Sequence, residues 1–110
     1  MAYDEDLAAR VRDCLQPDNG LSEKKMFGGL AFLINGHMAV AASGQGGLLV
    51  RVDPARTDAL ARRPYAARFV MRGREMNGWL RVDAPGVRTE ADLESWVRIG
   101  LAYVRTLPPK

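Results

Sequence analysis

The chain has 110 residues, of which 47% are hydrophobic and 26% charged, and its formal net charge is +3. This length suits one domain, and this balance excludes a disordered tail, a coiled-coil rod and a collagen-like chain. No apolar run approaches the roughly 20 residues of a membrane span, and the acidic start over residues 1–6 is unlike a secretory signal. With Cys14 as its one cysteine, we expect a single cytoplasmic domain over residues 1–110 and no membrane association.

Apolar residues at helical spacing predict a first helix from about Tyr3 to Leu15. Cys14 lies on the apolar stripe of this helix, so we interpret it as part of the core rather than as a nucleophile. The turn-forming residues 17–20, Pro-Asp-Asn-Gly, are expected to end the helix.

The dipeptide Asn35-Gly36 stands between two apolar runs, which predicts a β-hairpin with a type I′ turn. In this register Phe32 faces Ala39 and Leu33 faces Met38. One face of the hairpin would carry Leu30, Phe32, Ile34, Ala39 and Ala41, and the other Ala31, Leu33, Met38, Val40 and Ala42. Both faces are apolar, which is unusual for an antiparallel pair with one solvated side. We therefore expect a partner to cover the second face, a homodimer being the simplest case.

Glycines flank this hairpin on both sides. Gly28-Gly29 interrupts the strand before it and indicates a bulge or a close approach of two backbones. The segment 43–47, Ser-Gly-Gln-Gly-Gly, lacks the spacing of a phosphate-binding loop and leads into a strand over residues 48–52, so it is interpreted as a turn.

The second half of the chain predicts a short helix, two strands and a long helix. Asp53-Pro54 is typical of a helix start, and this helix is expected to end near Ala61. Strands follow over 67–71 and 79–82, joined by a polar connection over 72–78, and Thr89 is expected to cap the last helix. The order α-β-β-β-α-β-β-α predicts an α+β fold, a two-layer α/β sandwich with an antiparallel five-stranded sheet.

Six arginines fall in one stretch of the chain that has Glu75 as its only acid. They are Arg62, Arg63, Arg68, Arg72, Arg74 and Arg81. If they converge in space they form a candidate nucleic-acid-binding patch. The alternative is an ordinary solvated basic face, and no helix-turn-helix or other nucleic-acid-binding motif accompanies them.

The sequence has few residues in patterns typical of catalytic or metal-binding sites. His37 is the only histidine, and no HxxxH, CxxC or clustered-Asp pattern is present. Ser22, Ser43 and Cys14 stand in no recognisable nucleophile motif. We therefore expect no catalytic residue, no metal and no cofactor. An enzyme or ligand-binding domain of unknown substrate stays open as an alternative, with a site near His37 or Arg51 assembled only in the fold.

Several apolar, aromatic and basic residues lie outside clear helical stripes or on the second hairpin face, and these are the candidate partner-binding residues. They are Lys25, Phe27, Leu33, Met38, Val40 and Trp79. Aromatic residues of this kind occur at the centres of protein interfaces. For Phe27 and Trp79, packing between the sheet and the helices is the alternative interpretation.

The motif Lys-Met-Phe-Gly-Gly at 25–29, followed by the hairpin and by Met-Asn-Gly-Trp at 76–79, resembles the N-terminal domain of the TfoX/Sxy family. The likeness covers nearly the whole chain. It implies a two-layer α/β sandwich with the same element order and a regulatory binding module rather than an enzyme. The matched positions are either a fold signature or a binding site.

The same resemblance implies a partner. Members of that family that regulate competence, the uptake of DNA, promote natural-transformation genes alongside the cAMP receptor protein, so a transcription regulator is an expected kind of partner. Those regulators carry a second, C-terminal helical domain, which this sequence does not show, so we expect a stand-alone N-terminal-type domain with a partner of its own.

Overall fold

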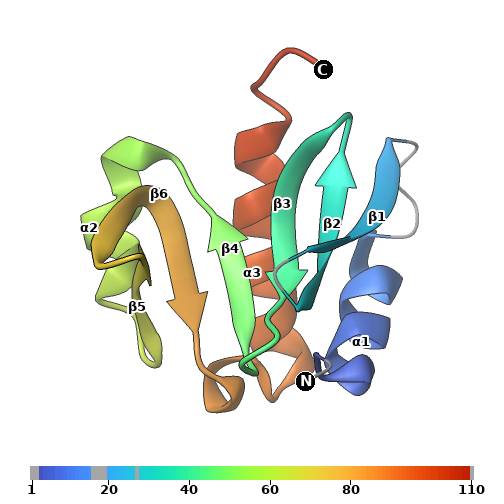
Figure 1. Ribbon diagram of the computed structural model, residues 1–110, viewed down its shortest axis with the longest axis horizontal. Coiled ribbons are helices and arrows are strands. Elements are labelled where there is room, and N and C mark those ends of the chain that lie inside the picture. The colour runs from blue at the N-terminus through green and yellow to red at the C-terminus, as the bar shows by residue number, and fades with distance from the viewer. Residues whose placement is uncertain (1–2, 16–19, 27, 110) are drawn as a thin grey trace.

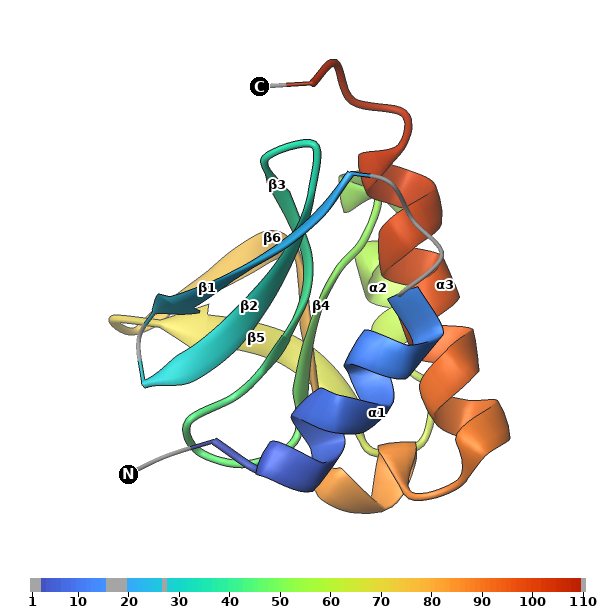
Figure 2. The ribbon, with the colours of Figure 1, turned by 90° about the vertical axis from the view of Figure 1, so that its right-hand side faces the viewer.

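A computed structural model describes residues 3–15, 20–26 and 28–109. Its elements are α1 (Glu5–Leu15), β1 (Leu21–Met26), β2 (Gly29–Ile34), β3 (His37–Ala42), β4 (Leu48–Arg51), the 3-10 helix η1 (Pro54–Arg56), α2 (Thr57–Ala61), β5 (Ala66–Met71), β6 (Arg74–Val82), the 3-10 helix η2 (Ala84–Val87) and α3 (Glu90–Val104). The strands that the structure describes form one antiparallel sheet in the order β1-β2-β3-β4-β6-β5, and the α-helices lie on one side of it (Figures 1 and 2). The α+β sandwich is confirmed.

The sheet has six strands within the described residues, one more than the five expected. The extra strand is β1, whose sequence Leu-Ser-Glu-Lys-Lys-Met is too polar to show a strand pattern. It is an edge strand, where both faces are partly solvated and lysines discourage pairing with other chains. Gly28, at φ 76°, lies in the turn from β1 into β2, and Gly29 is the first residue of β2. A Cβ atom at Gly29 would lie 2.4 Å from the carbonyl oxygen of Ala42, so the expected close approach of two backbones is confirmed.

The turn at Asn35-Gly36 is confirmed, and Leu33 pairs with Met38 as expected. The predicted pairing of Phe32 with Ala39 is wrong, because Phe32 pairs with Val40 and the register shifts there. The extra residue, Ala39, is buried in a small cluster with Ile34 and Val104, directly beneath α3. As a result Val40 and Ala42 face the helices and Ala41 faces away, the reverse of the expectation.

The polar stretch 72–78 is not a connection. Arg72 and Gly73, at φ 54° and 77°, form a tight turn, and the rest of the stretch is the first half of β6. The β5–β6 register then shifts between Arg68 and Val70. At this irregularity the N–H of Gly78 donates to Thr57 Oγ1 over 2.9 Å, and its carbonyl accepts from the N–H of Val52 over 2.8 Å.

The main core lies between the sheet and the helices. Phe32, Leu48 and Leu80 come from the sheet, and Trp96 and Val97 come from α3. At Gly100 a Cβ atom would lie 2.6 Å from the carbonyl oxygen of Ala39, so the glycine allows α3 to rest directly on β3. Thr89 caps α3 as predicted, its side chain accepting from the N–H of Asp92.

Cys14 packs half-buried against this core, which agrees with a structural role. Burial raises the pKa of its thiol, and the charges of Glu94 and Glu90 raise it further. Since the thiolate is the reactive form, we expect a thiol-directed reagent at neutral pH to modify Cys14 more slowly in the native protein than in denaturant. Equal rates in the two states, measured by absorbance of the released chromophore, would contradict this placement.

An ion pair joins α1 to the edge strand β1. Arg12 donates to the two carboxylate oxygens of Glu23 over 2.5 and 2.9 Å. These hydrogen bonds hold the pKa of Glu23 below its usual range. A lowered native pKa contributes stability that is present above the unfolded pKa of glutamate and is lost as pH falls through the native value.

We therefore expect Glu23→Gln to lower the free energy of unfolding at pH 7 by more than it does at pH 3. Urea denaturation of both proteins at the two pH values measures this difference. If the difference in free energy of unfolding between the two proteins is the same at both pH values, or is larger at pH 3, the ion pair does not stabilise the β1 edge.

Candidate functional site

The candidate site is a groove of about 300 Å³ on the side of the sheet that carries no helix. Figure 2 shows the β1–β2 and β5–β6 ends of the sheet extending away from the helices, so this side is concave. Met38 and Ala41 from β3 and Leu49 from β4 form the floor of the groove. Its walls include Met26, Phe69 and Met71, and its remaining lining residues are Gly29, Ala42, Ser43, Gly44, Gln45, Val70, Arg72 and Arg81.

Strand register explains why these residues meet. Side chains opposite one another in neighbouring strands share a face of the sheet. One such row crosses five strands in the order Lys24, Ala31, Ala41, Leu49 and Arg81. The alanines of this row are buried by their neighbours, whereas Leu49 is half-buried. The second apolar face expected from the hairpin therefore exists, and no α-helix of the described chain covers it (Figure 2).

The charged residues that the described strands place on this face are all cations. The carboxylates within the described strands are Glu23 and Glu75. Glu23 pairs across the sheet with the core residue Phe32, and Glu75 lies beside Arg68, which binds Asp58 on α2, so both are directed to the helix side. There they form ion pairs with Arg12 and Arg68. No carboxylate is among the described residues that line the groove, whereas two arginines are. The groove therefore has an apolar floor and a cationic rim.

Arg81 is a structural residue at one end of the groove. Its guanidinium donates to Ser43 Oγ over 3.1 Å and to the carbonyl of Gly46 over 2.7 Å, and it pairs with Asp83 at 3.5 Å. It is half-buried in this position. These contacts hold the loop over residues 43–47 against β6. The charge of Arg81 is therefore largely neutralised by groups of the same chain.

The six candidate nucleic-acid-binding arginines do not form one patch. Arg63 lies over the ring of Trp96 at 4.6 Å, and Arg68 binds Asp58 on the outer side of β5. Arg62 is exposed at the end of α2. Only the remaining three reach the helix-free side, and these are Arg72, Arg74 and Arg81.

The candidate partner-binding residues are also divided. Leu33 and Met38 lie half-buried on the helix-free face, as expected. Val40 is wholly buried in the core, so its assignment to the outer face is wrong. Lys25 is exposed but pairs with Leu30, whose side chain faces the helices. Phe27 lies outside the described residues.

Trp79 does not line the groove. Its ring lies 5.4 Å from the guanidinium of Arg51, which also lies 5.5 Å from the ring of Tyr103 on α3. The residues predicted from the sequence did not include Met26, Leu49, Phe69 or Met71 of the groove, nor Lys24. The alternation of Phe69 and Met71 within one strand was the available signal for the β5 wall.

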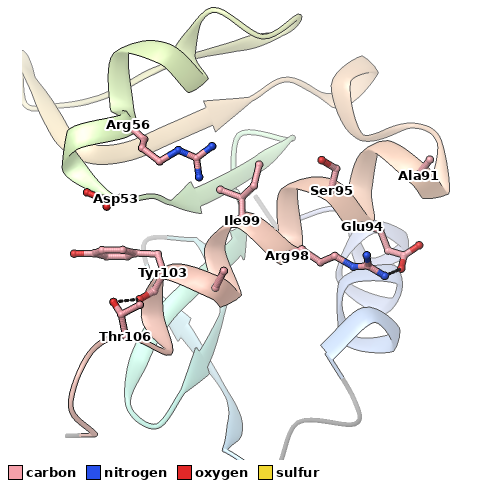
Figure 3. A pocket seen from close by; sticks show the side chains of 10 residues that line it. Asp53, Arg56, Ala91, Glu94, Ser95, Arg98, Ile99, Tyr103 and Thr106 are labelled. Carbon is pink, nitrogen blue, oxygen red and sulfur yellow. Dashed lines mark hydrogen bonds and ion pairs between the residues drawn. The ribbon is translucent and has the colours of Figure 1, made fainter.

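A second hollow, of about 720 Å³, follows the outer side of α3 (Figure 3). Figure 3 shows Arg56 extending across it above Ile99, with Asp53 and Tyr103 at one end. Its charges have both signs, and two of them are already paired, since Arg98 binds Glu94 at 2.8 Å. Its lining residues include no histidine or cysteine. The arrangement offers neither a nucleophile with its base nor a surface of one chemical character.

His37 serves the fold. Its Nε2 lies 2.6 Å from the carbonyl oxygen of Pro108 and donates to it, which ties the β2–β3 hairpin to the segment after α3. Its Nδ1 is buried without a partner. Among the described residues there is no group of three or more side chains that could hold a metal ion, and none of the described helices is long and apolar enough to cross a membrane.

The model of the TfoX N-terminal domain family matches residues 13–103. The chain belongs to the TfoX N-terminal domain family. This family is regulatory and non-catalytic and is associated with competence. No curated protein and no solved structure matches the chain.

The motif glycines of the TfoX N-terminal domain have structural reasons in this chain. A Cβ atom at Gly29 would lie 2.4 Å from the carbonyl oxygen of Ala42. Gly28 and Gly78 adopt φ values of 76° and 89°, which favour glycine. These constraints favour a fold signature at the glycine positions, although the motif residues Met26 and Gly29 also line the groove.

Proposed function

We propose that this TfoX N-terminal domain is a non-enzymatic regulatory module that binds another protein through the helix-free face of its sheet. The observation that carries the proposal is the apolar groove floored by Met38, Ala41 and Leu49, on a face left open by the helices. Burying such side chains stabilises a complex by roughly 25 cal/mol for each Å² of apolar surface removed from water. By analogy with the competence regulators of the family, the proposed partner acts in transcriptional regulation.

The side chains of the groove suit a binding role. Methionines stand at the β1 wall, on the floor and at the β5 wall, at positions 26, 38 and 71. The unbranched thioether side chain adapts to different shapes and is common at binding surfaces. The alternative of a site near His37 or Arg51 has less support, because neither residue lines the two hollows described above.

The experiment is crosslinking in the source cells with the wild-type chain and two glutamate variants, followed by mass spectrometry. Met38→Glu places a charge on the groove floor, and Ala102→Glu places the same charge in the hollow beside α3. We expect a protein that is captured by the wild type and by Ala102→Glu but lost with Met38→Glu. Circular dichroism and thermal melting establish that both variants are folded.

Two results would contradict the proposal. One is an identical set of captured proteins for the wild type and Met38→Glu. The other is the capture of no protein at all. The nucleic-acid alternative is tested separately by gel-shift assays at low salt, because binding through phosphates weakens steeply as salt rises.

A further inference from the structure

We infer that the partner presents to this groove an acidic peptide segment with large apolar side chains. The inference rests on the proposed function and specifies the partner of the same site. Three observations carry it. The floor of the groove is apolar, its described lining residues include no carboxylate, and strand register places exposed cations on the same face at both ends of the groove. A peptide in which Asp or Glu residues alternate with apolar residues, or stand on either side of them, is complementary to all three features.

The available cations stand on opposite sides of the groove. Lys24 on β1 lies on the groove face, opposite Ala31, and Arg74 on β6 lies opposite the groove residue Met71. Arg72 lines the groove at the β5–β6 turn. All three are exposed, and none of them forms an ion pair in the described part of the chain, whereas Arg81 is bound to Asp83. An acidic partner would supply the missing counter-charges.

The spread of these cations favours a peptide over a small anionic ligand. Lys24 is on β1 and Arg74 is on β6, and four steps between neighbouring strands separate β1 from β6 in the sheet. At about 4.8 Å for each step, this is roughly 19 Å around the curve. One carboxylate or phosphate head cannot neutralise both ends. A chain with several acidic side chains can, while its apolar residues enter the groove between them.

The same charges disfavour a second copy of this chain on the groove face. Two such faces brought together would place Lys24, Arg72 and Arg74 of one copy near those of the other. Like charges across an interface oppose association and suppress wrong partners. The homodimer expected from the hairpin is thus less suited to this face than an acidic partner.

A nucleic acid is also a poor match for this face. The methionines and Leu49 on the floor and walls are poorly suited to hydrogen-bonding or stacking with bases.

The test is selection of short random peptides displayed on phage, with the full wild-type chain as the target. We expect the enriched peptides to carry Asp or Glu next to Leu, Phe or Met. One enriched peptide is then labelled, and its dissociation constant is measured by fluorescence anisotropy. The double variant Lys24→Glu/Arg74→Glu should weaken its binding by about tenfold or more, because two attractive pairs become repulsive.

The matched control is Arg62→Glu, which makes the same change of charge at an exposed residue outside the groove, at the end of α2. We expect the affinity of Arg62→Glu to equal that of the wild type. We also expect added salt to weaken the wild-type complex more than that of the double variant.

The outcomes separate the inference from the proposed function. If Met38→Glu abolishes peptide binding but the double variant does not, the face binds proteins and the acidic preference is wrong. Enrichment of basic or uncharged peptides, or of none, also overturns the acidic preference. Sedimentation showing a dimer that Met38→Glu dissociates would assign the face to a second copy instead. Loss of binding in the double variant, with Arg62→Glu unchanged, supports the inference.

Discussion

Replacing Phe32 by alanine is expected to lower the free energy of unfolding by about 3–5 kcal/mol. Phe32 lies in the middle of the core cluster and is 0% exposed, the largest of the fully buried side chains. Its removal leaves a cavity beneath the helices that neighbouring side chains fill only in part. A domain of this size has a total stability of about 5–15 kcal/mol, so the variant would retain a small part of it.

Chemical denaturation followed by tryptophan fluorescence measures the change. The matched control is Val70→Ala, since Val70 is 53% exposed on β5. Its free energy of unfolding should stay within about 0.5 kcal/mol of that of the wild type. Similar losses for the two variants would mean that Phe32 does not lie in the main core.

The second large effect is expected at the family motif. Gly29→Ala should destabilise the fold by about 1–3 kcal/mol, because the new Cβ atom must displace backbone. The atom that it meets is the carbonyl oxygen of Ala42, 2.4 Å away. Since this backbone bounds the groove, the variant should also lose affinity for partners, but only in proportion to its loss of folded protein.

The control for Gly29→Ala is Gly73→Asn. Gly73 has φ 77° and open space around its Cβ position, and asparagine tolerates this left-handed conformation. We expect Gly73→Asn to change the stability by less than about 0.5 kcal/mol. If Gly29→Ala instead kept the stability of the wild type and lost only binding, the motif would be a recognition element rather than a fold signature.

The parts of the fold that are predictable from the sequence are those set by local signals. Asn35-Gly36 predicts its turn because both residues must adopt positive φ, and Thr89 predicts its helix start because a side-chain oxygen must accept a free N–H. Both depend on residues within a few positions of one another. The edge strand β1 gave no such signal, because a strand with polar residues on both sides has no alternation.

The candidate site was predicted only in part. Leu33 and Met38 were assigned to the correct face because they lie next to the turn, before the register shifts. Val40 was assigned to the wrong face because Ala39 bulges, and side chains alternate with a period of two residues. The contact between α3 and β3 at Gly100 accompanies that bulge and is invisible in the hairpin sequence.

The amino-acid sequence alone determined the helices, the central hairpin, the family and the presence of apolar residues on both faces of that hairpin. Only the tertiary structure decided which face the helices cover, and it alone brought Leu49 and Phe69 to one groove with Lys24 on the same face of the sheet. The physical reason is that turns and caps depend on neighbouring residues, whereas a shared face depends on the register of distant strands. One bulged residue in one strand shifts that register and so reverses the face to which each following side chain points.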